Sequence, residues 1–203
     1  MSRLSARISS IQRETDSVHD LKPMTPLGLH EPVIETHGPV TLTEVTDTAL
    51  ASVAARLGRE ADTAAILASV LGSEAPAPAR HGGKTLTAFW MGPDQWMVEA
   101  PLETHEDLAA QLAATSEGAM SVTEQTDAWC RFDLSGERLA DVFERLCSAN
   151  TRAFTGGEAV RTAIEHLGCF LLCRTPAHIS VLGPRSAANS LHHALLTAMR
   201  SAH

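Results

Sequence analysis

The chain has 203 residues, of which 44% are hydrophobic and 20% charged, and both values are ordinary for a globular protein. A chain of this length can bury a substantial core and is most simply one domain or two small, closely packed halves. Its formal net charge of −8 argues against a general nucleic-acid or anionic-membrane binder, because both functions need a basic surface.

The cysteine pattern and the N-terminal sequence favour a cytoplasmic protein. The four cysteines, Cys130, Cys147, Cys169 and Cys173, are not spaced as a disulfide framework or a zinc site and are expected to be buried thiols. No apolar run approaches the roughly 18 residues that span a bilayer. The first fifteen residues lack the apolar core of a secretory signal, although their Arg- and Ser-rich composition also fits a mitochondrial transit peptide.

Residues 1–39 are interrupted by four prolines, Pro23, Pro26, Pro32 and Pro39. Because proline fixes the backbone and removes a hydrogen-bond donor, this segment cannot form a long helix or a central strand. We therefore expect residues 1–39 to form an extended N-terminal arm, which lies on a partner rather than on its own small domain.

The chain from residue 40 alternates between strand and helix patterns. Residues 40–46 predict a strand, and residues 49–58 fit either a strand or a helix. Residues 61–72 predict a helix that ends at Gly72.

The segment AFWMGPDQWMVEAP, residues 88–101, predicts a hairpin with a type I turn over residues 92–95. In that register Met91 faces Trp96 and Trp90 faces Met97, so that each face carries one Trp–Met pair. A hairpin that is apolar on both faces must be covered on both sides, by this chain or by another protein.

The second part of the chain repeats a similar order of elements. It predicts helices at 103–118 and 136–150, strands at 119–126 and 128–136, three short strands from residue 160 to residue 184, and a last helix after Pro184. The whole pattern indicates an α+β fold with two βαβ-containing halves, at about 40–118 and 119–203, and largely antiparallel sheets.

No local motif for chemistry is found. There is no glycine-rich phosphate loop and no GxSxG elbow, and the HEDL segment at 105–108 lacks the second histidine of a zinc-protease helix. We therefore predict no catalytic, cofactor-binding or metal residue in this chain. Arg131 and Asp133 share a strand face and form either a structural or a functional pair. Arg185 opens a helix, where the dipole disfavours a cation, so it either reaches a partner's carboxylate, binds an anion or lies on plain surface.

Three segments together resemble one protein family. The motif W-x-G-P-D-x-W of residues 90–96, the strand DAWxRFxLSG of residues 127–136 and the segment at 178–198 resemble the gamma subunit of heterotetrameric sarcosine oxidase. The resemblance is collinear over roughly residues 40–200. It implies a fold similar to the folate-binding domain of aminomethyltransferases, with ferredoxin-like halves.

The resemblance also implies the function and the partners. The complex is an oxidoreductase that demethylates sarcosine to glycine, with hydrogen peroxide and 5,10-methylenetetrahydrofolate as further products. FAD, FMN, NAD, zinc and tetrahydrofolate are expected in the alpha, beta and delta subunits, and none in this chain. The gamma subunit itself would be non-catalytic and would contact mainly the alpha subunit, for which Trp90, Trp96 and Arg185 are the candidate interface residues.

Two other interpretations stay open. A free-standing folate-binding or one-carbon transferase module would need an acidic residue in a central cleft, and Asp94, Asp127 or Asp133 could serve. The chain could also be an unrelated interaction domain. Relatives that maintain iron–sulfur enzymes carry a KGCxxGQE-like stretch, and FTGGEA at 154–159 lacks its cysteine and glutamine, which argues against that role.

Overall fold

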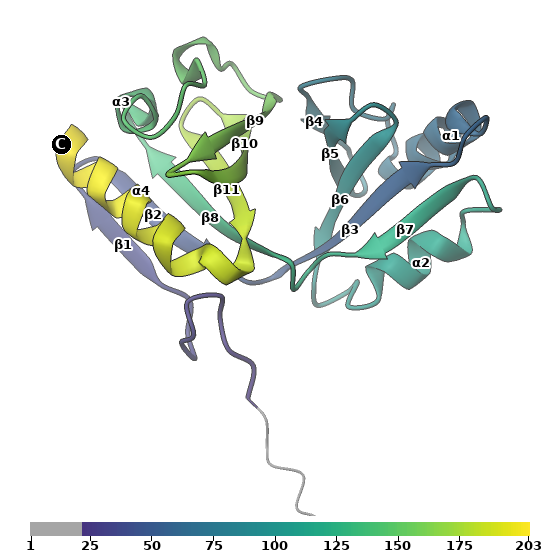
Figure 1. Cartoon of the computed structure of the whole chain (residues 1–203), viewed down its shortest axis with the longest axis horizontal. Coiled ribbons are helices and arrows are strands. Elements are labelled where there is room, and N and C mark those ends of the chain that lie inside the picture. Colours follow the sequence, from purple (N-terminus) through teal and green to yellow (C-terminus); the bar gives the residue numbers. More distant parts are fainter. Residues whose placement is uncertain (1–21) are drawn as a thin grey trace, which may run out of the picture.

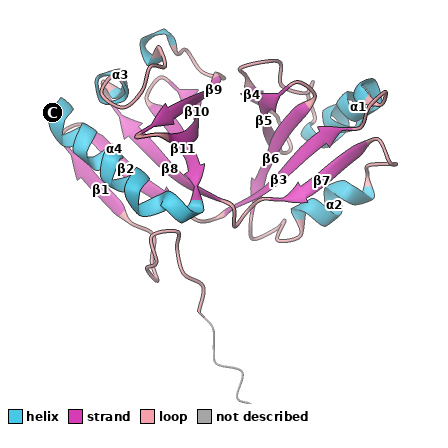
Figure 2. Cartoon of the chain, viewed as in Figure 1, coloured by secondary structure: helices cyan, strands magenta, loops and turns pink. Residues whose placement is uncertain are grey.

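The computed structural model describes residues 22–203, which form two antiparallel sheets packed against each other (Figures 1 and 2). The first sheet has the order β1-β2-β8-β11-β10-β9, and its strands are Ile34–His37 (β1), Val40–Val45 (β2), Trp129–Gly136 (β8), Ala159–Ile164 (β9), Leu167–Thr175 (β10) and His178–Pro184 (β11). The second sheet has the order β4-β5-β6-β3-β7, and its strands are Thr48–Ala55 (β3), His81–Gly82 (β4), Thr87–Gly92 (β5), Gln95–Pro101 (β6) and Met120–Glu124 (β7). The predicted α+β fold with antiparallel sheets is confirmed.

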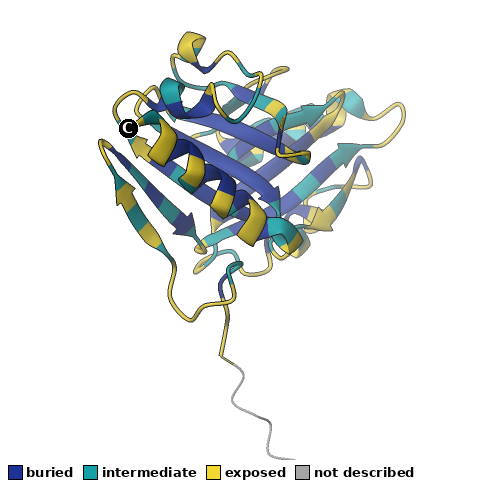
Figure 3. Ribbon diagram, turned by 60° about the vertical axis from the view of Figure 1, so that its left-hand side comes forward, coloured by how far each residue is buried: buried dark blue, intermediate teal, exposed yellow. Residues whose placement is uncertain are grey.

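Each sheet has helices on its outer face, and each layer has its own core. Helices α1 (Glu60–Leu71) and α2 (Leu108–Ala114) pack on the second sheet, and α3 (Leu139–Phe143) and α4 (Ala188–Ala202) pack on the first. Figure 3 shows the buried side of α4 against the first sheet and its exposed side toward solvent. A third apolar cluster fills the space between the sheets and contains Leu50, Phe89, Met97, Phe170, Leu172 and Leu182.

Each sheet contains strands from both the N-terminal and the C-terminal part of the chain. Strand β2 belongs to the first sheet, together with β8 to β11, whereas β7 belongs to the second sheet beside β3. The β2–β3 and β7–β8 connections therefore both pass between the lobes, as Figure 1 shows, and the Leu50 amide donates to Thr126 Oγ1 there at 3.0 Å. The expected division near residue 118 stays a prediction.

Several predicted elements change type or length in the folded chain. The ambiguous segment at 49–58 contributes the interior strand β3, because its pairing with both β6 and β7 outweighs the helix propensity of alanine. Helix α2 begins at Leu108 rather than at 103, since the Pro101 carbonyl accepts the His105 amide in a preceding turn at 3.1 Å. Helix α3 ends at Phe143, where the Leu146 amide bonds the Phe143 carbonyl in a tighter turn.

The predicted register of the tryptophan hairpin is wrong by one residue. Trp90 lies opposite Trp96, and Phe89 lies opposite Met97, because Met91 is the extra residue of a bulge. Asp94 has a φ of 55°, whereas a type I turn needs a negative φ at that position. Both tryptophans therefore pack into the core under α1 and α2, while the opposite face packs between the sheets. The prediction that both faces are covered is confirmed, and this chain supplies the cover.

The described part of the arm packs on its own domain, contrary to expectation. Leu27 contacts the core of the first sheet, and residues 34–37 form its edge strand β1. Residues 1–21 of the predicted arm lie outside the described residues. Between residues 22 and 203, no helix is both long enough and apolar enough to cross a bilayer.

Candidate functional site

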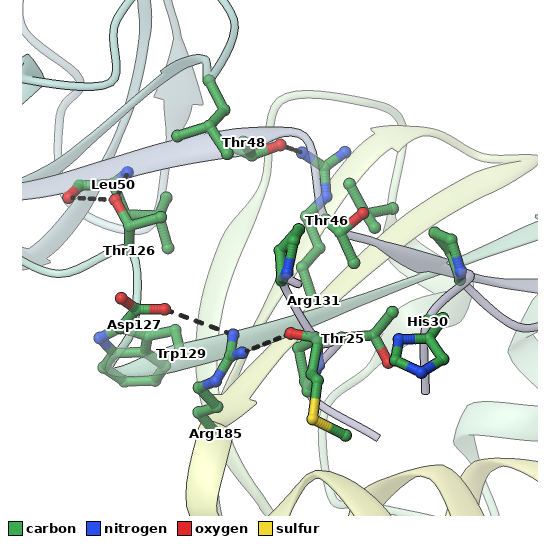
Figure 4. Close-up of a pocket in the computed structure, with 16 residues that line it drawn as sticks. Thr25, His30, Thr46, Thr48, Leu50, Thr126, Asp127, Trp129, Arg131 and Arg185 are labelled. Atoms are coloured by element: carbon green, nitrogen blue, oxygen red, sulfur yellow. Dashed lines mark hydrogen bonds and ion pairs between the residues drawn. The ribbon is translucent and has the colours of Figure 1, made fainter. Parts of the chain in front are cut away.

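A pocket of about 340 Å³ lies where the arm meets the two connections between the sheets (Figure 4). Three prolines and Met24 of the arm form one wall. The β2–β3 connection, the Thr126–Asp127 loop and the start of β8 form the opposite side, and Arg185 closes one end. We call this cavity the arm pocket. Its volume is within the range of cavities that bind small molecules or a side chain of another protein.

The arm is held in place by a buried carboxylate that the sequence analysis did not single out. Glu44 of β2 is 1% exposed, and its two oxygens accept the amide N–H groups of Leu27 at 3.0 Å and Val33 at 3.1 Å. The sequence did contain a signal, because Glu44 shares its strand face with the apolar Val40 and Leu42. A charged residue at that position needs hydrogen-bond partners.

Two side chains of β8 form fixed parts of the wall. The indole of Trp129 donates to Gln125 Oε1 at 3.1 Å and packs against Phe170 with the ring centroids 5.7 Å apart. Arg131 makes a bidentate pair with Asp133, with both nitrogen–oxygen distances at 2.8 Å. These side chains have partners already and are therefore preorganised.

The guanidinium of Arg185 has fewer hydrogen-bond partners than that of Arg131. It donates one hydrogen bond to the Met24 carbonyl at 3.0 Å, which ties the arm to the turn before α4. Its other terminal nitrogen lies 3.6 Å from a carboxylate oxygen of Asp127, whose side chain is 87% exposed. An exposed pair at this distance is weak, so the guanidinium keeps donors for a further acceptor.

A network of buried charges runs from the arm pocket into the space between the sheets. Glu99 of β6 accepts a hydrogen bond from Arg174 of β10 at 2.7 Å, and Arg131 lies 3.7 Å away. Burial acts to raise the pKa of Glu99, but the two guanidinium groups outweigh it and hold the pKa below its usual value. Glu99 is therefore ionised at neutral pH.

Asp133 is the second carboxylate of this network. Burial acts to raise its pKa, but the hydrogen bonds and charge of Arg131, together with hydrogen bonds from Ser180 and His178, hold the pKa below its usual value. His178 Nε2 lies 2.8 Å from Asp133 Oδ2. A second pocket of about 350 Å³ lies beside Glu99, and Arg131 lines both cavities.

The structure separates the predicted interface residues. Trp90 and Trp96 face each other in the hairpin, and Trp96 is 7% exposed with its indole nitrogen bonded to the Pro76 carbonyl at 2.9 Å. Arg185 lines the arm pocket, which neither tryptophan reaches. The assignment of the three residues to an interface stays a prediction.

The three acidic candidates do not share one cleft either. Asp94 is at the exposed hairpin turn, Asp127 lines the arm pocket, and Asp133 is paired with Arg131. Of the three, only Asp127 lines the arm pocket, and the alternative of a one-carbon transferase module stays a prediction.

The thiols and possible metal ligands offer no further site in the described chain. Cys130, Cys169 and Cys173 are free and buried, whereas Cys147, which was expected to be buried as well, is free and only half-buried. Burial raises the pKa of Cys130 to about 12 and that of Cys169 and Cys173 to about 11. Thiols with such pKa values are poor nucleophiles at neutral pH. Within residues 22–203 no group of three or more His, Cys, Asp or Glu side chains is placed to hold a metal ion.

Comparison with known proteins finds solved structures of similar fold, and two of them have TM-scores above 0.5. No protein-family model and no curated protein sequence matches the chain. A chain of the heterotetrameric sarcosine oxidase from Corynebacterium sp. U-96, in complex with pyrrole 2-carboxylate, superposes with a TM-score of 0.72 at 24% identity. The match covers 82% of this chain and 88% of that chain.

The second structure is the glycine cleavage system aminomethyltransferase T from Bartonella henselae. It superposes with a TM-score of 0.58 at 14% identity, over 79% of this chain and 46% of the aminomethyltransferase. The present chain therefore spans about half the length of that enzyme. Both likenesses concern the fold, and they agree with the fold class expected from the sequence.

Proposed function

We propose that the chain is the gamma subunit of a heterotetrameric sarcosine oxidase, an oxidoreductase complex that demethylates sarcosine to glycine. The observation that carries this proposal is the reciprocal coverage with one chain of such an oxidase, 82% of this chain and 88% of that one. The tryptophan hairpin, the DAWxRFxLSG strand and the C-terminal segment support the same assignment, because they resemble this subunit in collinear order.

In this proposal the chain is a rigid structural component rather than a catalytic one. The charged side chains between the sheets have partners within this chain, because Glu99 pairs with Arg174 and Asp133 pairs with Arg131. FAD, FMN, NAD, zinc and tetrahydrofolate would be held by the alpha, beta and delta subunits. The alpha subunit would be the main contact of this chain.

Purification of the tagged full-length chain from its own cells tests the proposal. We expect a complex whose native mass includes larger chains, whose visible spectrum shows bound flavin, and which forms hydrogen peroxide when sarcosine is added. A colourless chain without partners would refute the assignment. Tetrahydrofolate titration of that lone chain, followed by calorimetry, would then test the alternative of a free-standing folate-binding module.

A further inference from the structure

Exposed apolar side chains are concentrated in the N-terminal segment that forms one wall of the arm pocket. The described residues have four exposed large hydrophobic side chains. Three of them, Met24, Leu29 and Ile34, belong to one stretch of eleven residues that runs from the arm to the start of β1. They are 54%, 47% and 67% exposed. Several exposed apolar side chains in one segment that also lines a cavity are typical of a protein–protein interface, whereas single exposed residues such as Leu57 are ordinary.

The pocket has the properties of a preformed binding site for an anchor side chain. Trp129 is fixed by Gln125 and Phe170, and Arg131 is fixed by Asp133, so a ligand would not have to order these walls. Binding energy at protein interfaces is concentrated at anchors in rigid pockets that lose their water on binding and are surrounded by weaker contacts.

The charge at the pocket indicates the chemistry of the partner. The lining contains two arginines, and Arg131 is neutralised by Asp133 while Arg185 is only loosely paired with the exposed Asp127. Arg185 therefore provides a guanidinium that is partly free, on a chain with a net charge of −8. A guanidinium binds a carboxylate with two parallel hydrogen bonds.

We propose that the arm pocket receives an apolar anchor side chain from a partner subunit, and that a carboxylate of the same partner segment pairs with Arg185. Glu44 acts as a positioning residue, because it holds the arm that forms one wall of the pocket. This inference rests on the proposed function, since it needs a partner subunit.

A different protein fits this surface better than a second copy of the chain or a small molecule. Two copies would each carry a net charge of −8 and would repel each other. A small molecule in the pocket would leave Leu29 and Ile34 uncovered, because neither side chain lines the cavity.

Matched variants of the tagged full-length chain test this inference by native mass spectrometry of the purified complex. Arg185→Glu reverses the charge at the pocket, and its control Arg56→Glu reverses that of an exposed arginine after β3. Leu29→Asp alters the arm, and its control Leu57→Asp alters a side chain that is 98% exposed elsewhere. Circular dichroism and melting temperature show whether each variant folds. If Arg185→Glu does not fold, the assembly of Leu29→Asp relative to Leu57→Asp tests the docking site instead.

We expect Arg185→Glu and Leu29→Asp to lower the ratio of assembled to lone chain by at least about tenfold, as loss of an interface charge pair or an apolar contact does. Arg185→Lys should fall between wild type and Arg185→Glu, and both controls should assemble as wild type does. Equal assembly of Arg185→Glu and Arg56→Glu would overturn the docking site and leave the proposed function intact. A wild-type chain found alone, as a dimer of copies or with a small carboxylate bound would overturn both.

A flavin-free complex that Arg185→Glu disrupts would support the docking site and overturn the proposed oxidase. Incorporation of a photo-crosslinking amino acid at Leu29 then identifies the partner segment. We expect that segment to contain an aspartate or glutamate close to a large apolar residue, and a segment without an acidic residue would contradict the pairing with Arg185.

Discussion

Glu99 and Arg174 join the two sheets through a buried ion pair, with 2.7 Å between Glu99 Oε1 and an Arg174 terminal nitrogen. Glu99 belongs to β6 of the second sheet and Arg174 to β10 of the first. The pair lies near the apolar cluster between the sheets, where Phe89 and Phe170 are in contact with ring centroids 5.1 Å apart. Apolar packing and a desolvated charge pair therefore hold the two lobes together.

Glu99→Ala should lower the free energy of unfolding by about 3–5 kcal/mol, because it leaves Arg174 buried without its carboxylate partner. Urea denaturation of wild type and variant measures this difference. Glu106→Ala, at an exposed position before α2, is the matched control and should change stability by less than about 0.5 kcal/mol. Equal stability of the two variants would show that the pair does not contribute to the packing of the sheets.

Stability should fall as the pH is lowered below the usual pKa values of the two network carboxylates. The folded pKa of Glu99 is held below 4.5 and that of Asp133 below 3.8, so the folded state binds fewer protons than the unfolded state in this range. The stabilisation is complete above these values and is lost as pH falls through the lower folded pKa values. Denaturation at a series of pH values from 7 to 3 measures the effect, and Glu99→Gln should give a shallower decline.

The two tryptophans of the hairpin should contribute differently to stability. Trp96→Ala should cost about 3–5 kcal/mol, since it creates a cavity in the core and removes the hydrogen bond to Pro76. Trp90 is only half-buried, so Trp90→Ala should cost less. Thermal unfolding of both variants tests the order, and an equal or larger loss for Trp90→Ala would contradict it.

Glu44→Ala should release the arm while the sheets stay folded. The variant removes the acceptor for the Leu27 and Val33 amides, and loss of a hydrogen bond to a charged group costs about 1.5–3 kcal/mol. Hydrogen exchange of these amides should therefore become about tenfold faster or more. Glu31→Ala, at an exposed position in the arm, is the control, and unchanged exchange in Glu44→Ala would contradict the role of Glu44.

Local patterns predicted most of the elements but not how they meet. Residues 128–136 alternate strictly between Trp129, Arg131 and Asp133 on one side and Cys130, Phe132 and Leu134 on the other, and the strand forms with that alternation. The hairpin was located correctly, but its register was not, because the bulge at Met91 depends on how the tryptophans pack under the helices.

The candidate site was predicted only in fragments. The sequence singles out Arg185 because it predicts a helix start there, although α4 begins three residues later, and it singles out Arg131 and Asp133 as a pair. The sequence did not predict that Glu44 holds the arm or that Glu99 reaches Arg174, since 75 residues separate the latter two. Such contacts depend on which strands become neighbours, and no local periodicity encodes that.

Local sequence patterns predict the type of most elements, the antiparallel α+β class and the apolar character of both hairpin faces, because these properties follow from the period of the side chains along the backbone. Three features depend on long-range packing: β2 joins the first sheet and β7 the second, the described part of the arm packs on its own domain, and a pocket forms beside Arg185. These features arise where segments far apart in sequence bury apolar surface together and satisfy one another's charges.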